Sequence, residues 1–162
     1  MEIERNVESY LKDRLDQYKN WYDNKAVSAK KKYLRGRVWA AIGAVIVPVL
    51  TNITLPSVSL IDGYYISITK ILVTIVSTAV ALSIALEGVL HYREQWKNYR
   101  TTEQYLTAQK NLFCNNVGDY SGLSREDAFK LLVNRVETAI TEENAITLNV
   151  LTKIDNGGRN AG

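Results

Sequence analysis

The chain has little of what catalytic and metal-binding sites usually require. Its 162 residues include one cysteine, Cys114, and one histidine, His91. A single cysteine cannot form an intrachain disulfide, and the sequence has neither a glycine-rich phosphate loop nor Cys and His at metal-ligand spacing. We therefore expect no enzymatic activity, no catalytic residues, no metal site and no cofactor.

Charge is absent from two stretches in the middle of the chain, residues 38–61 and 71–86. A helix of about 20 mostly apolar residues spans a bilayer, and a helix that is apolar on all sides lies in lipid or deep inside a protein. A chain of this length cannot easily bury two such helices on every side. We therefore favour a transmembrane hairpin, with spans at about 38–56 and 66–90, over a soluble protein with two apolar core helices.

Basic residues flank both stretches, whereas the bend between them carries one charge, Asp62. They are Lys30, Lys31, Lys32, Arg35 and Arg37 before the first stretch, and His91, Arg93, Lys97 and Arg100 after the second. Lys and Arg beside a span stay in the cytoplasm, so we expect a multi-pass inner-membrane protein with both termini cytoplasmic. The partner is then the lipid bilayer, whose anionic head groups the clusters can hold, and we expect no direct binding of genomic nucleic acid.

The segments around the hairpin have the apolar spacing of helices. Residues 2–37 contain no proline and a single glycine, Gly36, and their apolar side chains recur at intervals of three and four. The second span continues outward with the same spacing until a stop near Gly118, and Ser124 is expected to cap a last helix. No stretch alternates cleanly, as a strand would.

Together these patterns predict an all-α membrane protein, a two-span transmembrane helical hairpin with long cytoplasmic helical extensions and a packed C-terminal helix. The expected parts are a cytoplasmic N-terminal helix (1–37), the hairpin (38–90), cytoplasmic helices (91–150) and a flexible tail (151–162).

Polar residues on the second span are candidates for lining a pore. They are Ser67, Lys70, Thr74 and Ser77, with Glu87 at the inner end. Charges inside a membrane rarely face lipid, which favours a water-filled path. Two alternatives remain open, because Lys70 can snorkel to the outer head groups and Glu87 can pair with His91 or a basic neighbour.

The first span has small residues at spacings that indicate close helix packing. These are Ala40, Gly43 and Ala44, followed by Val47. Pro48 is expected to bend this span mildly, because proline lacks the N–H that a helix interior uses.

The order of motifs resembles that of the SLATT superfamily. YLKDRLDQYKNWYDNKA precedes the hairpin, and EQWKNYRTTEQYL, a GDY loop and NRVETAITEE follow it, so the resemblance covers residues 8–148. SLATT domains are bacterial two-span domains that accompany nucleotide-sensing or nucleotide-synthesising proteins in conflict systems. The resemblance implies a pore-forming or membrane-perturbing effector, as in antiphage defence, triggered by a nucleotide-derived second messenger or by such a partner protein.

The most specific part of the resemblance is Trp96, Tyr99 and Arg100, followed by Glu103. One interpretation is a ligand-binding or gating site, in which Arg stacks on aromatic rings and holds phosphate. The other is an aromatic belt and helix–helix core in which Arg100 pairs with Glu103 or Glu137.

Two functions fit the sequence. The first is a homo-oligomeric pore or ion channel gated by the cytoplasmic helices, since one hairpin cannot enclose a water path and several copies are needed. The second is a membrane anchor or scaffold that recruits a soluble signalling partner.

Overall fold

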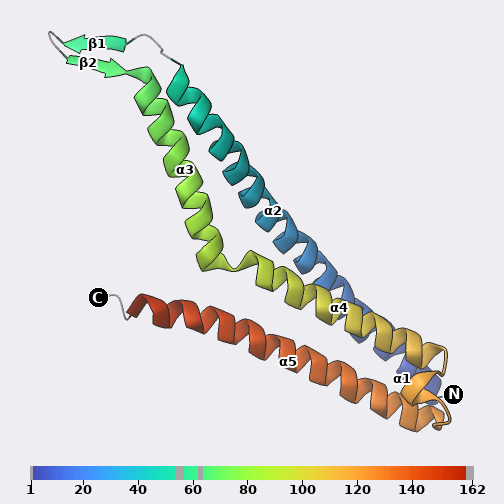
Figure 1. The fold of residues 1–162 in the computed structure, drawn as a ribbon. Helices are drawn as coiled ribbons and strands as arrows, with labels where there is room; N and C mark the ends of the chain where they lie inside the picture. Colours follow the sequence, from blue (N-terminus) through green and yellow to red (C-terminus); the bar gives the residue numbers. More distant parts are fainter. Residues whose placement is uncertain (1, 54–56, 62–63, 160–162) are drawn as a thin grey trace. The chain divides into compact units, whose positions relative to one another are not determined.

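The computed structural model describes residues 2–53, 57–61 and 64–159, and it divides into two compact units. Met1–Lys30 and Arg93–Gly162 form one unit, which we call the bundle. Lys31–Tyr92 form the other, which we call the hairpin. The long helix α2 (Asp16–Asn52) contributes residues to both units (Figure 1).

The bundle is built from helices that pack around one apolar core. In chain order they are α1 (Glu2–Ser9), the π-helix η1 (Tyr10–Leu15), the start of α2, α4 (Tyr92–Cys114), the 3₁₀ turn η2 (Gly118–Tyr120) and α5 (Arg125–Arg159). The core residues recur at helical spacing, for example Leu106 and Phe113 on α4 and Leu132 and Val136 on α5. They join Leu15, Tyr22 and Tyr120 in a single buried cluster, so the C-terminal helix packs against the N-terminal ones.

The connection between α4 and α5 follows the predicted stop and start signals. After α4 ends, Asn116 and Gly118 adopt positive φ angles of 53° and 63°. Ser124 caps α5, because its Oγ accepts a hydrogen bond from the backbone N–H of Asp127 at 3.1 Å. The predicted cap is therefore confirmed.

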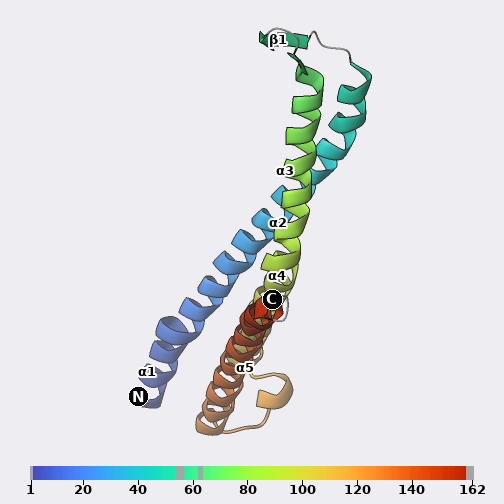
Figure 2. The same cartoon turned by 90° about the vertical axis from the view of Figure 1, so that its left-hand side faces the viewer.

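The hairpin consists of the rest of α2 and of α3 (Ile68–Leu90), which lie next to each other in Figure 1 and cross in Figure 2. A two-stranded antiparallel sheet, β1 (Ser57–Ile61) and β2 (Tyr64–Ser67), closes their far end, with Ser57 opposite Ser67 and Val58 opposite Ile66. The predicted all-α fold is otherwise confirmed. Ser57, Val58, Ser59 and Leu60 alternate polar and apolar residues, but four positions are at the lower limit of a pattern that indicates a strand.

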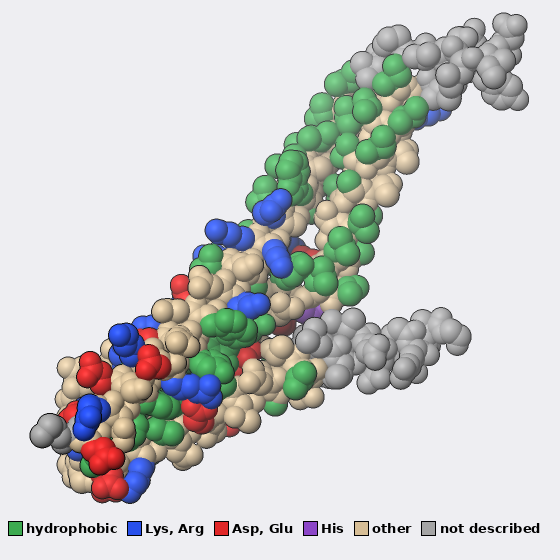
Figure 3. All heavy atoms as spheres, turned by 180° about the vertical axis from the view of Figure 1, so that it is seen from behind, with side chains coloured by type: hydrophobic (Ala, Val, Ile, Leu, Met, Phe, Trp, Pro, Cys, Tyr) green, Lys and Arg blue, Asp and Glu red, His purple; other side chains and the backbone are tan. Residues whose placement is uncertain are grey.

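Two helices are long and apolar enough to cross a membrane: the continuous helical segment Glu2–Asn52, through its apolar end, and Ile68–Leu90. No described residue of α3 is buried, and large apolar side chains such as Val45, Ile75 and Leu82 are more than half exposed. The space-filling view shows hydrophobic side chains covering the hairpin helices (Figure 3). The two spans predicted from the missing charges thus correspond to exposed apolar helices, while residues 54–56 of the first span lie outside the described residues.

Two details differ from the sequence expectations. The N-terminal helix contains the π-helical segment η1, after which the N–H of Asp16 bonds to the carbonyl of Leu11. The second span does not continue unbroken, because α3 ends at Leu90 and His91 adopts a left-handed conformation with φ 48°. Helix α2 passes through Gly36 without ending, in line with the expected nearly unbroken N-terminal helix, and α5 extends to Arg159.

Candidate functional site

The hairpin helices meet along a seam of small and apolar residues. On α2 the less exposed positions are Tyr33, Gly36, Ala40, Gly43, Val47 and Leu50, and on α3 they are Thr69, Val73, Val76, Val80, Ser83, Glu87 and Leu90. Both sets recur at intervals of three and four, as in left-handed helix pairs. The helices approach closely at Gly43, where an added Cβ would overlap the side chain of Val80. The expected close packing therefore involves Ala40, Gly43 and Val47, but Ala44 is exposed.

The predicted pore-lining residues do not share one environment. The exposed face of α3, which borders the seam, carries Lys70, Thr74 and Ser77. Ser67 is half-buried just before the helix. The Thr74 hydroxyl donates to the carbonyl of Lys70 at 2.8 Å, which satisfies its polar group within the helix. Glu87 belongs to the seam instead, so the structure separates it from the other four.

A groove near the end of the hairpin that the short sheet closes contains three of these residues. It has a volume of about 520 Å³, and its lining includes Lys70 and Thr74 from α3, Ser67 at the end of β2, Thr51 from α2 and Ile53 just after α2. Hydroxyl groups and one ammonium therefore gather where the helices meet the short sheet.

A second groove, which we call the inner groove, lies at the opposite end of the hairpin. It has a volume of about 530 Å³, and its lining residues are Gly36, Arg37, Val38, Ala40, Ala41, Ser83, Ile84 and Glu87. Most of these side chains are small or apolar, and the two charged ones have opposite sign. The sequence analysis treated Arg37 only as part of the basic flank.

The aromatic and arginine set on α4 packs into the bundle. The Tyr99 ring lies 5.9 Å from that of Trp21 and 6.2 Å from that of Tyr22. Lys30 places its ammonium 5.5 Å from the centre of the Trp96 ring. These contacts favour the helix–helix interpretation of Trp96 and Tyr99 over a free stacking site.

Arg100 is engaged by two carboxylates. Its guanidinium lies 2.9 Å from Asp23 and 3.0 Å from Glu103, and these contacts raise its pKa, the hydrogen bond to Glu103 most of all. Pairing with Glu103 was expected, but Asp23 was missed, because it lies on another helix far away in sequence. Arg100 is therefore not free to hold a phosphate in this conformation.

Glu137, the other expected partner of Arg100, binds Arg14 instead. Two guanidinium nitrogens of Arg14 donate to the two carboxylate oxygens at 3.0 and 2.8 Å, and the Tyr10 hydroxyl adds a third bond at 3.0 Å. Arg14 and Tyr10 both belong to the π-helical segment, and π-segments often mark functional positions. The hydrogen bond from Arg14 is the main reason that the pKa of Glu137 is lowered.

A buried carboxylate lies further along α5. Glu143 is only 3% exposed, and its Oε1 accepts a hydrogen bond from the Thr147 hydroxyl at 2.7 Å. Burial, and then the negative charge of Glu143, raise the pKa of Tyr22 and of Tyr99. The Tyr22 hydroxyl is buried and has no partner in hydrogen-bonding geometry among the described residues.

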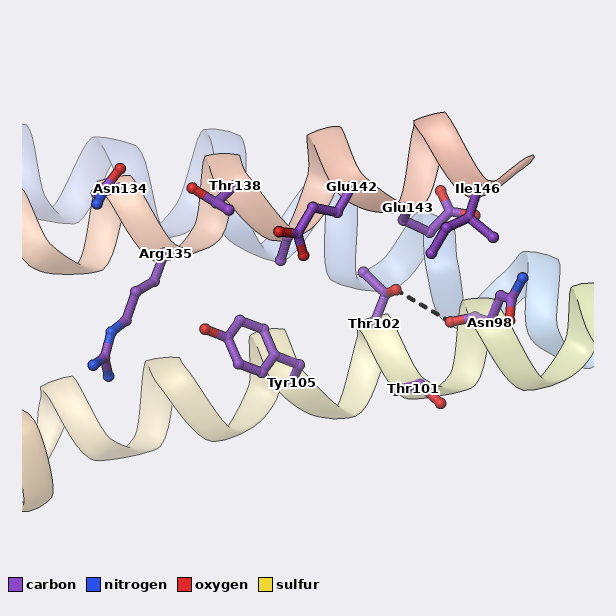
Figure 4. A pocket seen from close by; sticks show the side chains of 11 residues that line it. Asn98, Thr101, Thr102, Tyr105, Asn134, Arg135, Thr138, Glu142, Glu143 and Ile146 are labelled. Atoms are coloured by element: carbon purple, nitrogen blue, oxygen red, sulfur yellow. Dashed lines mark hydrogen bonds between the residues drawn. The ribbon is translucent and has the colours of Figure 1, made fainter. Parts of the chain in front are cut away.

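Beside Glu143, a pocket of about 520 Å³ opens between α4 and α5 (Figure 4). Figure 4 shows the Arg135 side chain extending from α5, and the Tyr105 ring from α4, into the space between the two helices. The lining also includes Asn98 and Thr102 from α4 and Asn134, Thr138, Glu142, Glu143 and Ile146 from α5. Arg135 is already held by Asp119 at 2.6 Å and by Gln109 at 3.3 Å. This pocket could not be predicted from the sequence, because polar residues on two helix surfaces are typical of solvated faces.

No metal centre is visible in the part of the chain that the structure describes, where His, Cys, Asp and Glu never gather in groups of three or more that could hold an ion. Cys114 is exposed and unpaired.

Comparison with known proteins gives one family. The model of a family described as protein of unknown function (DUF4231) matches residues 17–128. That range includes the whole hairpin and α4 but only the first turn of α5, so Glu137, Glu143 and the α5 wall of the pocket lie outside it. No curated protein and no solved structure matches the chain.

Proposed function

The chain belongs to the DUF4231 family of proteins of unknown function, and we propose that it is a bacterial inner-membrane protein whose hairpin crosses the bilayer and assembles into a homo-oligomeric pore or ion channel. The bundle gates this pore from the cytoplasm, where both termini lie. The motif resemblance to the SLATT superfamily supports a role as an effector in a defence or conflict system.

The observation that carries the membrane part is the exposure of the apolar helices. Large side chains such as Val45 and Leu82 are 68% and 58% exposed, and no described residue of α3 is buried. Exposing this many large apolar side chains to water is strongly unfavourable, whereas a bilayer accommodates them.

The pore part is supported by the exposed polar face of α3. The side chains of Lys70, Thr74 and Ser77 are exposed within one chain. A polar face on an otherwise apolar span favours contact with water or with another copy. In a ring of hairpins, these faces line the path, with Lys70 at its outer end. Glu87 lies on the seam, so its charge contributes less to the path.

Ion flux and selectivity test the pore. Purified protein in liposomes should conduct ions, and a ring of Lys70 ammonium groups should oppose cations. Lys70→Gln should therefore raise cation preference, measured as a shift of the reversal potential under a salt gradient. Glu87→Gln should shift it less and in the opposite direction. If neither substitution moves the reversal potential, the proposed lining is wrong.

Cysteine labelling tests the topology. In a Cys114→Ser background, a cysteine placed at Ser59 of β1 should react with an impermeant reagent in intact cells. The wild-type protein serves as the control. Its native Cys114 is exposed in the bundle and should react only after the cytoplasm is opened. Labelling of Ser59→Cys only in opened cells would contradict this orientation.

The trigger is proposed to be a nucleotide-derived second messenger or a partner protein. The pocket between α4 and α5 is of a size typical for small ligands, and it offers the Tyr105 ring and two amides for a base. Thermal shift measurements with a panel of cyclic and linear nucleotides test this idea. Tyr105→Ala should abolish any shift, whereas Arg100→Gln should leave ligand binding intact, because Arg100 lies in the helix contact.

The second candidate function is a membrane anchor or scaffold. It is favoured by the same exposed pocket, which a partner protein can occupy as well as a small ligand. Absence of conductance under every trigger, together with capture of a soluble signalling protein that depends on the α4–α5 face, would support it.

A further inference from the structure

The inner groove contains two charged side chains that lack partners. Neither Arg37 nor Glu87 forms a side-chain hydrogen bond or ion pair with any described residue, and the two do not pair with each other. In the bundle, charges such as Arg14 and Arg100 are paired with carboxylates. Arg37 and Glu87, by contrast, are two opposite charges that line one groove of the hairpin without pairing.

The remaining lining of the groove is mostly apolar or small, so a small hydrated ion would leave most of it without contacts. Val38, Ala41 and Ile84 give it apolar walls, and Gly36 leaves its floor open, since an added Cβ at Gly36 would meet nothing within 4 Å. An unpaired charge beside apolar surface is unfavourable unless a ligand or water satisfies it. A matching ligand thus combines an anion, a cation and an apolar chain.

We propose that the inner groove binds a zwitterionic phospholipid with a phosphate and a primary ammonium in its head group. The Arg37 guanidinium donates hydrogen bonds to the phosphate, since its planar fork matches phosphate oxygens. The Glu87 carboxylate accepts hydrogen bonds from the ammonium. One acyl chain follows Val38, Ala41 and Ile84 along the helices.

The position in the sequence agrees with this assignment. Arg37 is the last charge before the first uncharged stretch, and Glu87 is the first charge after the second. Both therefore lie where the hairpin leaves the hydrocarbon layer, at head-group depth on the cytoplasmic side. An anionic lipid without an ammonium satisfies Arg37 but leaves Glu87 unmatched and adds repulsion. The inference rests on the proposed membrane insertion but not on the pore.

Native mass spectrometry of the full chain, released from a mild detergent, tests the site. The protein is titrated with phosphatidylethanolamine and, separately, with phosphatidylglycerol of the same acyl chains. We expect one tightly bound phosphatidylethanolamine with a clear preference over phosphatidylglycerol. Glu87→Gln should reduce the ratio of the two lipid affinities about tenfold, as expected for a lost charge-assisted hydrogen bond. Arg37→Gln should weaken binding of both lipids.

A matched pair of variants separates the groove from general lipid contact. Gly36→Leu places a side chain in the groove and should block the tight site. Gly88→Leu adds the same side chain at a position that does not line the groove. A Cβ there meets nothing within 4 Å, so this variant should leave binding unchanged. Because Gly88 is also a helix glycine, this control corrects for effects of leucine on folding.

Three results overturn the proposal. Equal binding of both lipids that no substitution alters indicates only a nonspecific lipid shell. If glycerophosphoethanolamine, which has no acyl chains, competes as strongly as the intact lipid, then the proposed contact between an acyl chain and the groove is wrong. Loss of hairpin stability in Arg37→Gln and Glu87→Gln without a change in lipid binding assigns the charges to each other. Failure of membrane insertion is distinguished separately, because the chain would then be extracted from membranes by alkaline carbonate and bind no lipid of either kind.

Discussion

Gly43 of α2 lies so close to Val80 of α3 that a Cβ built on the glycine would overlap the valine side chain. The same added Cβ would lie 3.7 Å from Cγ1 of Val76. Without this glycine the two helix backbones could not approach as they do. Small residues are the usual means of close helix contact in membranes, where there is no hydrophobic drive between helices.

We therefore expect Gly43→Ala to destabilise the hairpin, although alanine is the better helix former by about 1 kcal/mol. The clash with Val80 should outweigh that gain, and Gly43→Leu should cost about 1–3 kcal/mol, as overpacking usually does. Thermal unfolding in one detergent measures the change. Gly88→Ala is the control, because its Cβ meets nothing within 4 Å and should be neutral or stabilising. If Gly43→Ala and Gly88→Ala behave alike, the helices do not cross at Gly43.

Two buried tyrosines in the bundle allow a matched test of hydrogen bonding. The Tyr22 hydroxyl makes no hydrogen bond of good geometry with the described residues, although Glu143 lies near enough to raise its pKa, whereas the Tyr120 hydroxyl donates to Gln109 Oε1 at 2.7 Å. Leaving a buried polar group unpaired costs free energy, and a satisfied bond contributes about 1 kcal/mol. Tyr22→Phe should therefore be neutral or stabilising, and Tyr120→Phe should lower the free energy of unfolding by about 1 kcal/mol. Chemical denaturation of the two variants measures both values, and the opposite order would show that Tyr22 is hydrogen-bonded in solution.

Much of the architecture could be predicted from the sequence, because it depends on local patterns. Missing charge over two stretches indicated the apolar helices, and the apolar spacing of three and four indicated the bundle helices. The Ser124 cap followed from a side chain that acts within its own turn.

Contacts between distant segments could not be predicted in the same way. Arg100 has a neighbour in its own helix, Glu103, which was predicted, and one on another helix, Asp23, which was not. Glu137 was expected to serve Arg100 but bonds to Arg14. The choice among several carboxylates depends on how the helices are rotated against each other, and spacing within one helix does not determine that rotation. For the same reason, the sequence did not indicate that Glu87 lies on the seam and not on the exposed face of α3.

Two carboxylates in the bundle predict a loss of stability in acid. Hydrogen bonds from Arg14 lower the pKa of Glu137. For Asp16, burial is the largest single influence and raises the pKa, but the hydrogen bond and charge of Lys110, helped by Lys19, lower it overall. A carboxylate with a lowered pKa in the folded state contributes stability above its unfolded value, about 4, and loses it as the pH falls through the folded value.

The bundle should therefore become less stable as the pH falls below about 4. Both carboxylates are roughly a third exposed, so each contribution should be at most about 1 kcal/mol. Unfolding midpoints of the wild type and of Glu137→Gln with Asp16→Asn, compared between pH 6 and pH 3, measure the effect. The double variant should start less stable and show a shallower decline, and parallel curves would contradict the assignment.

The junction between α3 and α4 depends on an unusual backbone at His91. This residue ends α3 with φ 48° and ψ 38°, while its N–H bonds to the carbonyl of Glu87 at 3.1 Å. A left-handed conformation costs a non-glycine residue about 1–2 kcal/mol, and glycine adopts it without that penalty. His91→Gly should therefore raise the stability of the protein by up to about 1 kcal/mol, and His91→Val should lower it, because β-branched side chains tolerate positive φ least. If the junction instead straightens into one continuous helix, the order reverses, since valine is a better helix residue than glycine. Thermal unfolding of the two variants, with His91→Asn as a third that also accepts this conformation, decides between the two arrangements, and it does so whether or not a pore forms.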